Sequence, residues 1–430
     1  MDVPLGDFMR IAELTLFLSL TVALCGCRER PRSISVRGIQ SPVPREGLTP
    51  QVTPVSDKKW ILSWQSPLTG GGWSFSMAMH DANGWSEVRQ IARGSDLSMF
   101  SADLPGVAVL PGDALLAYWE LKDARDGDPY ATSIRTAVSK DEGRSWSRPA
   151  QPYNGPLAGQ HSFISSFSID GGLGLAWLDA EERSKIRHSM MEHGGHDEGG
   201  GTGSIGLRYA ALDGEGRVTG GAFIDPITCE CCPTSAAIST SGPVMVYRGR
   251  RDPPGTKPSE VRSDRATVRD IYITRLSGGK WTKPHLVHAD NWVINACPDN
   301  GPAVDAAGNS AAVAWWTRAN DQPQVLVAFS SNAGDTFGPA IRVDAGNAEG
   351  QVTVTLLPDG KGAVVGWLEE GQTWARFVSA TGHAGSVAAL GPSPRHSRLP
   401  RWIAQGGGVL AVWTAKVNES RQVRIAQLTL

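Results

Sequence analysis

The sequence predicts an all-β fold of the β-propeller class with seven blades, and three observations support this prediction. A short apolar strand that ends in an aromatic residue recurs seven times along the 430 residues. A turn sequence rich in Gly, Asp and Pro precedes each of these strands, and another strand follows each of them. The aromatic ends lie 46 to 70 residues apart, which fits one four-stranded blade per unit.

The seven aromatic strands are the second strands of the predicted blades. They are WILSW (60–64), LLAYW (115–119), LGLAW (173–177), VMVY (244–247), AAVAW (311–315), AVVGW (363–367) and VLAVW (409–413). The turns before them, such as LPGD and DAAGN, contain residues that suit hairpins. We expect most of the 15 Trp residues to pack between blades rather than to contact a ligand.

The two ends of the predicted ring are expected to meet. The seventh unit stops at Leu430 after its third strand, so its blade lacks a fourth strand. The segment SISVRGI (33–39) can supply that strand and close the ring, which removes open sheet edges. A six-bladed ring is the alternative, in which the first or the last unit lies outside the ring.

The charge balance excludes two classes of partner. The chain has 41 basic and 43 acidic side chains, and its net charge is -2. Nucleic-acid-binding domains carry an excess of Lys and Arg on one face, and this composition offers none. We therefore expect no nucleic-acid partner and no electrostatic binding to an anionic membrane surface. The composition indicates no particular oligomeric state.

The N-terminal segment is expected to be a targeting signal rather than part of the fold. Its apolar stretch, residues 14–24, is too short to span a bilayer and suits a signal peptide. It runs into LCGC (24–27), which resembles the bacterial lipobox and implies lipid attachment at Cys27. A cleaved secretory signal without lipid is the alternative, and translation could start at Met9 instead of Met1.

This targeting signal defines the expected domains and location. Residues 1–26 are the signal peptide, 27–50 a tether with the closing strand, and 51–430 the propeller. Arg28 follows the lipobox cysteine, where an Asp would retain a lipoprotein in the inner membrane. The resemblance therefore implies a bacterial cell-envelope protein that a lipid anchors to the outer membrane.

Two turns carry a motif that points to a family. SKDEGRSW (139–146) and SSNAGDTF (330–337) resemble the Asp-box of the sialidase superfamily, whose Asp and Ser satisfy backbone groups of the turn. Over residues 50–430 the chain is also similar to bacterial lipoproteins often labelled exo-alpha-sialidase. The most particular matches are CECCPT (229–234), RDIYITR (269–275) and CPDNGPAV (297–304).

The resemblance implies a funnel that binds a glycan or a small carboxylated ligand, with exo-sialidase-like glycoside hydrolysis as the activity. Sialidases have six blades and hold the substrate carboxylate with three arginines, the first in an R-I-P motif that this sequence lacks. Arginines do recur near the starts of the predicted third strands, where they could form a carboxylate clamp or inter-blade salt bridges. These are Arg135, Arg208, Arg269, Arg376 and Arg424.

Unusual polar residues fall in the connections that share one face of a propeller. Loops from fourth to first strands and from second to third strands surround the central funnel, where ligands usually bind. The candidate ligand-binding residues are Met99, Gln160, His161, Asp299, Asn300, Gln351 and His396. The candidate catalytic residues are Asp179, Arg248, Arg318 and Glu369. Two insertions, 180–204 and 249–267, extend the same face.

The cysteines of the predicted domain allow two interpretations. Cys229, Cys231, Cys232 and Cys297 can form disulfides in an oxidising compartment, and we expect Cys297 to pair with one of the other three. They can instead bind a metal, copper above all, together with the segment HSMMEHGGH (188–196). The candidate ligands in that segment are His188, Met190, Met191, His193 and His196.

Three functions therefore follow from the sequence. The first is a sialidase-like lipoprotein that acts on, or binds, a glycan or another carboxylated ligand. The second is a copper-binding envelope protein, and the third is a non-catalytic scaffold for another envelope protein. Carboxylates about 5–9 Å apart beside arginines would favour glycoside chemistry, and converging thiol, imidazole and thioether groups would favour metal binding.

Overall fold

The computed structural model describes Met1 and residues 32–100, 104–123, 131–153, 159–180, 205–256, 266–394 and 397–430. All of the described strands belong to the compact unit Arg32–Leu430. Within the described ranges, no helix is both long enough and apolar enough to cross a membrane. The lipobox cysteine Cys27 lies outside the described residues.

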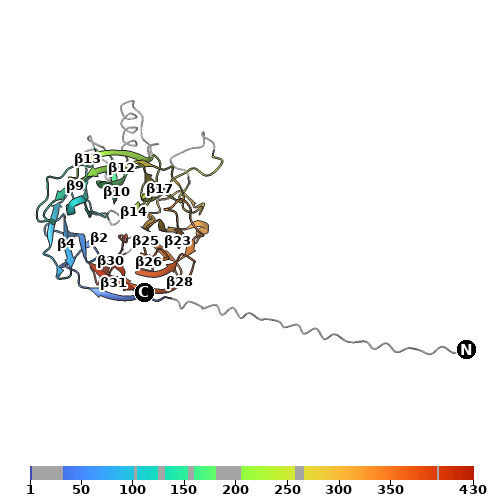
Figure 1. The fold of residues 1–430 in the computed structure, drawn as a ribbon. Coiled ribbons are helices and arrows are strands. Elements are labelled where there is room, and N and C mark those ends of the chain that lie inside the picture. Colours follow the sequence, from blue (N-terminus) through green and yellow to red (C-terminus); the bar gives the residue numbers. More distant parts are fainter. Residues whose placement is uncertain are drawn as a thin grey trace, which may run out of the picture. The chain divides into compact units, whose positions relative to one another are not determined.

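The unit is a seven-bladed β-propeller, which confirms the predicted fold class. Seven antiparallel sheets follow one another along the chain and are arranged around a common centre (Figure 1). Blades 1 to 6 each start with their innermost strand and proceed outward, as the order β10-β11-β12-β13 of blade 3 shows. The chain therefore returns to the centre six times, and each return brings a new connection to the funnel.

The innermost strands of blades 1 to 7 line the centre. They are β2 (Leu48–Ser56), β7 (Gly106–Val109), β10 (His161–Ile169), β14 (Ser235–Ser239), β21 (Ala303–Ala307), β25 (Ala348–Leu356) and β29 (Ile403–Gln405). The second strands contain the seven aromatic segments. They are β3 (Lys59–Pro67), β8 (Leu115–Lys122), β11 (Gly172–Asp179), β15 (Gly242–Arg248), β22 (Ser310–Thr317), β26 (Gly362–Glu369) and β30 (Gly408–Val417).

The third and fourth strands form the outer part of each blade. The third strands are β4 (Trp73–Asp81), β9 (Thr132–Ser139), β12 (Gly206–Asp213), β17 (Ile271–Ser277), β23 (Gln324–Ser330), β27 (Gln372–Ser379) and β31 (Ser420–Thr429). The outermost strands are β6 (Arg89–Gly94), β13 (Val218–Asp225), β19 (His285–Leu286), β24 (Ile341–Arg342), β28 (Ala384–Pro392) and β1 (Ser35–Ile39). In blade 2, a single bridge between Thr136 and Ala150 occupies the outer position.

Short elements complete the described structure. Strands β5 (Gly84–Trp85) and β18 (Lys280–Trp281) extend blades 1 and 4, and β16 (Thr267–Val268) pairs with β20 (Val293–Ile294). Two 3-10 turns, η1 (Pro111–Asp113) and η4 (Ala319–Asp321), lie in the connections of blades 2 and 5.

The N-terminal strand closes the ring, as the sequence predicted. Strand β1 pairs antiparallel with β31 over five residues, from Ser35 opposite Thr429 to Ile39 opposite Ile425. The seventh blade thus has the order β1-β31-β30-β29, with its outermost strand taken from the start of the chain. Strand β31 is consequently paired on both sides and offers no open edge.

Apolar side chains fill the seven interfaces between neighbouring blades. Each of seven buried clusters combines residues of two adjacent blades, and one of them joins blade 7 to blade 1. The second strands supply four of the five largest fully buried side chains, Trp64, Trp177, Trp315 and Trp367, each at most 1% exposed; the fifth, Trp402, precedes β29. This packing confirms that the recurrent Trp residues belong to the core between blades.

The two turns that resemble an Asp-box share one pattern of hydrogen bonds. Ser139 accepts the backbone N–H of Gly143 at 2.7 Å, and Asp141 accepts the backbone N–H of Ser145 at 2.9 Å. In the second turn, Ser330 accepts the N–H of Gly334, while Asn332 replaces the Asp and accepts the N–H of Thr336. The side chains therefore satisfy backbone donors that the turn leaves unpaired.

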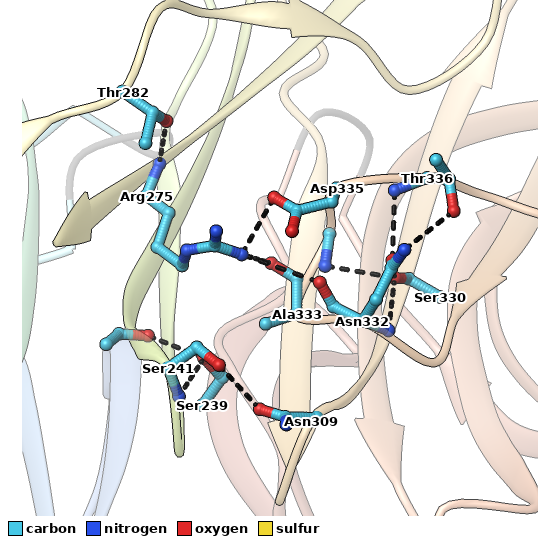
Figure 2. Close-up of polar contacts among 12 residues, drawn as sticks. Ser239, Ser241, Arg275, Thr282, Asn309, Ser330, Asn332, Ala333, Asp335 and Thr336 are labelled. Carbon is cyan, nitrogen blue, oxygen red and sulfur yellow. Dashed lines mark hydrogen bonds and ion pairs between the residues drawn. The ribbon is translucent and has the colours of Figure 1, made fainter.

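The second turn also ties two blades together (Figure 2). Arg275 of blade 4 donates to the carbonyl of Ala333 at 3.1 Å and forms an ion pair of 2.9 Å with Asp335. Both partners belong to the turn that follows β23 in blade 5. This contact is on the blade surface and gives the turn a structural role.

Candidate functional site

A cavity of about 320 Å³ lies at the centre of the ring. All seven blades contribute to its wall, through their innermost strands and the connections that precede these strands. The side chains that give the wall its polar character include Gln51, Ser165, Thr234, Gln351 and Tyr118. Such a concave site, with polar groups converging from many elements, is typical of ligand binding.

The wall carries positive charge. Arg398 and Arg401 are its only charged residues among the lining positions that the structure describes, and no Asp or Glu is among those positions. Arg398 donates to the backbone carbonyl of Thr234 at 3.0 Å, which holds the guanidinium against blade 4. Arg401 forms an ion pair of 2.6 Å with Asp305, so a carboxylate offsets part of its charge.

Three innermost strands share an irregularity near their first residues. Thr49 in β2, Phe163 in β10 and Gln351 in β25 have positive φ of 48°, 61° and 53°, and a register shift occurs at each position. Such β-bulges redirect side chains and are common next to functional sites, and left-handed non-Gly residues are energetically costly. After the bulges, Gln51 and Ser165 contribute to the cavity wall.

Tyr118 of β8 brings a phenol into this wall. Its hydroxyl accepts a hydrogen bond from Ser166 at 3.3 Å, and Gly106 packs against the hydroxyl where a larger residue would clash. Burial raises the pKa of Tyr118, although the hydrogen bond from Ser166 and the charge of Arg398 oppose the increase. The phenol therefore stays protonated at neutral pH and can donate a hydrogen bond.

The structure brings three predicted ligand-binding residues together beside the cavity. The backbone N–H of Gln351 donates to the side-chain oxygen of Asn300 at 2.6 Å, and its amide nitrogen donates to the carbonyl of Asp299, also at 2.6 Å. The predicted catalytic residue Arg248 lies behind them, because its Nε donates to the carbonyl of Asn300 at 2.8 Å. These contacts join the connections that start blades 5 and 6.

Arg248 is a buried structural centre in this arrangement. It is 1% exposed and also donates to the carbonyls of Arg269 at 2.5 Å and Trp316 at 2.7 Å. Its guanidinium lies 5.2 Å from the ring centre of Trp292. Three backbone carbonyls and an indole ring surround the charge, so the residue holds segments of blades 4 and 5 together.

The other predicted catalytic residues lie on different blades and are not brought together with Arg248. Asp179 ends β11 in blade 3 and accepts the indole N–H of Trp177 at 3.0 Å. Glu369 ends β26 in blade 6 and accepts the indole N–H of Trp367 at 2.7 Å. Arg318 is exposed in blade 5 and lies 3.9 Å from Asp321.

The remaining predicted ligand-binding residues take separate positions. His161 is fully buried at the start of β10, where Nδ1 lies 2.9 Å from the carbonyl of Thr132 and Nε2 lies 3.8 Å from Asp179. Gln160 donates to the hydroxyl of Ser162 at 2.9 Å, and Met99 is half-buried between β6 and β7. His396 and the whole segment 188–196 lie outside the described residues.

The cysteines form one disulfide and one thiol pair. Cys297 is bonded to Cys231, one of the three partners that the sequence allows, with a Cα–Cα distance of 6.1 Å that suits a disulfide. Cys229 and Cys232 are free, buried and 2.9 Å apart at their sulfur atoms. The sulfur atoms of Cys229, Cys231 and Cys232 lie within 4.8 Å of one another. The disulfide removes Cys231 and Cys297 as thiolate ligands. Of these four cysteines, only Cys229 and Cys232 could then bind copper as thiolates.

The disulfide loops also form part of the cavity wall. Pro233 and Gly301, which follow the two loops, both line the cavity. A Cβ on Gly301 would lie 2.0 Å from the carbonyl oxygen of Pro233, so only glycine permits this close approach. The cysteine cluster therefore lies directly behind the place where blades 4 and 5 meet at the cavity.

Sequence reasoning missed the residues that give the cavity its charge. Arg398 and Arg401 belong to the stretch SRLPRW (397–402), which leads into the innermost strand of blade 7. Both arginines lie in a fourth-to-first connection, so the criterion that selected the other candidate residues could have selected them too. Tyr118 was not predicted as a cavity residue, because it belongs to an aromatic strand and such strands mostly supply core residues.

Comparisons with known proteins report the fold and no family. No family model and no curated protein matches the chain. An ulvan lyase, from a family of polysaccharide lyases and bound to -[GlcA(1-4)Rha3S]-, is 9% identical with a TM-score of 0.54, over 91% of this chain and 96% of that one. At this identity the similarity shows a common fold.

Two further solved structures have lower scores. The alpha-L-arabinanase of Penicillium chrysogenum, complexed with arabinobiose, has a TM-score of 0.45 and 12% identity, over 93% of this chain and 98% of that one. The endosialidase of phage phi92 has a TM-score of 0.43 and 9% identity, over 92% of this chain and 69% of that one.

Proposed function

We propose that this protein binds a carboxylate-bearing glycan in the central cavity. The observation that carries the proposal is the charge of the wall. Seven blades converge on a cavity whose described lining contains two arginines and no Asp or Glu. The positive potential of such a site attracts an anionic group and disfavours a cationic one.

The chemistry of the wall suits a sugar acid. A guanidinium such as that of Arg398 can donate two parallel hydrogen bonds to a carboxylate. The amide of Gln51 can donate to, and accept from, sugar hydroxyls. The hydroxyl of Ser165, which lies 2.8 Å from that of Thr234, can accept from them. A cavity of about 320 Å³ is at the small end of the range for ligand sites and suits one or two sugar rings.

The described wall supports binding rather than hydrolysis. Most glycosidases use two carboxyl groups about 5–9.5 Å apart, and the described lining supplies none. A sialidase uses a tyrosine nucleophile with a glutamate partner. Tyr118 has a raised pKa and is hydrogen-bonded to Ser166, which does not activate it as a nucleophile.

The fold is consistent with this proposal. The ulvan lyase that shares the fold is bound to -[GlcA(1-4)Rha3S]-. That likeness supports only the general point that a propeller of this kind can hold a saccharide, because its identity to this chain is 9%. The choice of a carboxylated sugar rests on the arginines of this chain.

Calorimetric titration with sialyllactose, an oligogalacturonate and the carboxyl-reduced form of each tests the proposal. We expect at least one acidic sugar to bind, its reduced form to bind at least about tenfold more weakly, and Arg398→Gln to cause a similar loss. Arg217→Gln is the matched control, because Arg217 is 74% exposed and pairs with Asp213 in a turn of blade 3. If Arg398→Gln binds the acidic sugar as tightly as the wild type does, the assignment of Arg398 is wrong. If free sugar is released, the protein hydrolyses its ligand and is not only a binding protein.

We further propose that the propeller is a lipoprotein of the bacterial outer membrane. The lipobox-like LCGC at 24–27 supports lipid attachment at Cys27. Wild-type protein should be found in the membrane fraction and be extracted from it by detergent, and Cys27→Ser protein should be found in the soluble fraction. Equal partitioning of the two proteins would show that the anchor assignment is wrong.

A further inference from the structure

The four cysteines behind the cavity divide into an accessible pair and an inaccessible pair. We call the Cys231–Cys297 bond the surface disulfide, because Cys297 is exposed and Cys231 is half-buried. We call Cys229 and Cys232 the buried dithiol, because each is 1% exposed. The loop 229–232 carries three of the four sulfur atoms, so both pairs belong to one small site.

The sulfur atoms are close enough to exchange bonds. The Cys229 sulfur lies 2.9 Å from that of Cys232 and 3.7 Å from that of Cys231. Thiol–disulfide exchange needs a thiolate that reaches a disulfide sulfur, followed by attack of a second thiol on the mixed disulfide. Cys229 is in contact with both pairs, so it is placed to connect them.

The surroundings of Cys229 favour its thiolate. Arg269, which is 3% exposed, donates from Nη1 to the Cys229 sulfur at 3.1 Å, and Thr267 accepts from its Nε at 2.9 Å. Glu230 also pairs with this guanidinium at 3.4 Å and with Arg250 at 3.0 Å. An arginine in contact with a cysteine sulfur favours the thiolate, which is the form that attacks a disulfide.

The two thiols of the buried dithiol differ in acidity. Burial would raise the pKa of Cys229, but a hydrogen bond from Cys232 and the charges of Arg269 and Arg248 outweigh it and lower the pKa to about 7. Burial raises the pKa of Cys232, and its contact with Cys229 raises it further. Cys229, which contacts both Arg269 and the sulfur of Cys231, is therefore the nucleophile, and Cys232 keeps the proton until the second step.

We propose that this loop is a thiol–disulfide exchange site, in which the buried dithiol reduces the surface disulfide. In the first step the Cys229 thiolate attacks the sulfur of Cys231; the Cys229–Cys231 bond forms, and Cys297 leaves as a thiolate. In the second step Cys232 loses its proton and attacks Cys229; the Cys229–Cys232 bond forms, and Cys231 leaves. Two electrons pass from the buried pair to the surface pair, and the proton of Cys232 passes to the surface thiolates.

The exchange has a consequence for both redox chemistry and structure. It leaves an accessible dithiol that can reduce a disulfide of an external molecule, which takes up the two electrons. It also breaks the covalent link between the loops that precede β14 and β21, next to Pro233 and Gly301 in the cavity wall. The site thus couples a thiol reaction to the place where blades 4 and 5 meet.

Trapping with N-ethylmaleimide in the absence of reductant tests the proposal. The folded protein is incubated with the reagent at pH 7, denatured in acid, cleaved after Glu230, and mapped for alkylated and disulfide-bonded cysteines. We expect Cys297 to become alkylated while a Cys229–Cys232 disulfide accumulates. A surface disulfide that stays intact until the protein is unfolded would overturn the proposal, as would one copper or zinc bound per chain to four free thiols.

Variants separate the steps and control for folding. Cys229→Ser should slow the alkylation of Cys297 at least about tenfold, because it removes the nucleophile. Cys232→Ser should stop at the Cys229–Cys231 bond with Cys297 alone alkylated. If either variant does not fold, Arg269→Gln and Arg269→Lys give the answer. The rate should increase with pH through about 7 in the wild type, shift to higher pH in Arg269→Gln, and be largely restored in Arg269→Lys; an unchanged profile would exclude the mechanism.

Discussion

In two blades, the carboxylate at the end of the second strand has a structural role. Asp179 and Glu369 each accept the indole N–H of the Trp two residues earlier, at 3.0 and 2.7 Å. Both are buried, and an indole N–H in a core needs an acceptor. Their repeated position at the aromatic end of the strand therefore has a reason that does not involve a substrate.

Substitution of Asp179 distinguishes the structural role from a catalytic one. Asp179→Ala removes the acceptor of Trp177 and a 3.4 Å ion pair with Arg208, and it should lower the free energy of unfolding by about 2 kcal/mol. Ligand affinity in the cavity should stay within twofold of wild type in the folded fraction. Denaturant unfolding and calorimetry measure both, and a stable variant that had lost only ligand turnover would support catalysis instead.

The turn at 139–146 has a measurable electrostatic signature. The hydroxyl and the backbone N–H of Ser145 donate to Asp141, and these hydrogen bonds lower the pKa of that carboxyl to about 2. A carboxyl with a lowered pKa stabilises the fold above its unfolded pKa, and this contribution is lost as the pH falls through the folded value. NMR titration should find a midpoint near 2, and Ser145→Ala should raise it. A midpoint near 4 in the wild type would contradict the hydrogen-bonded turn.

For single residues, the sequence predicts which side chains lie near the cavity better than it predicts what those side chains bind. Asn300 and Gln351 were predicted from their place in the connections, and the structure brings them into contact at 2.6 Å. Arg248 was predicted on the same grounds, but its guanidinium binds three backbone carbonyls. A sequence shows where a charged residue lies along a repeat, but it does not show which carbonyls surround that residue after folding.

At the scale of single elements, β1 and the innermost strands show opposite degrees of predictability. Strand β1 could be predicted because the last blade lacked one strand and the segment 33–39 could supply it. The bulges of β2, β10 and β25 could not, because residues such as Phe163 have no preference for positive φ. The surrounding blade imposes that conformation, and local sequence carries no signal for it.

Deletion of the closing strand tests the ring at the same scale. A chain without residues 33–39 should expose the edge of β31, unfold at a lower temperature and aggregate more. A chain that begins at residue 32 is the control and should match the full propeller, because it retains β1. Equal stability of the two chains, measured by calorimetry and size-exclusion chromatography, would show that β1 does not contribute to closure.

The whole molecule combines a predictable scaffold with a site that emerges from its assembly. Seven repeated units specified seven blades, because each unit can bury its apolar face only against a neighbour. The cavity is different, since each blade contributes only a few lining residues and no single repeat contains the site. Arg398 and Tyr118 come from blades 7 and 2 and are brought to one wall only by closure of the ring.

The most direct test of the central claim is a crystal structure of the protein with the acidic oligosaccharide that binds best in calorimetry. We expect a sugar ring between the innermost strands, with its carboxylate about 3 Å from the Arg398 guanidinium. The surface groove between blades 2 and 3, lined by Tyr153, Arg208 and Phe223, is the main competing location. If the ligand binds in that groove, while the central cavity is empty and Arg398 contacts no sugar, the central cavity is not the binding site.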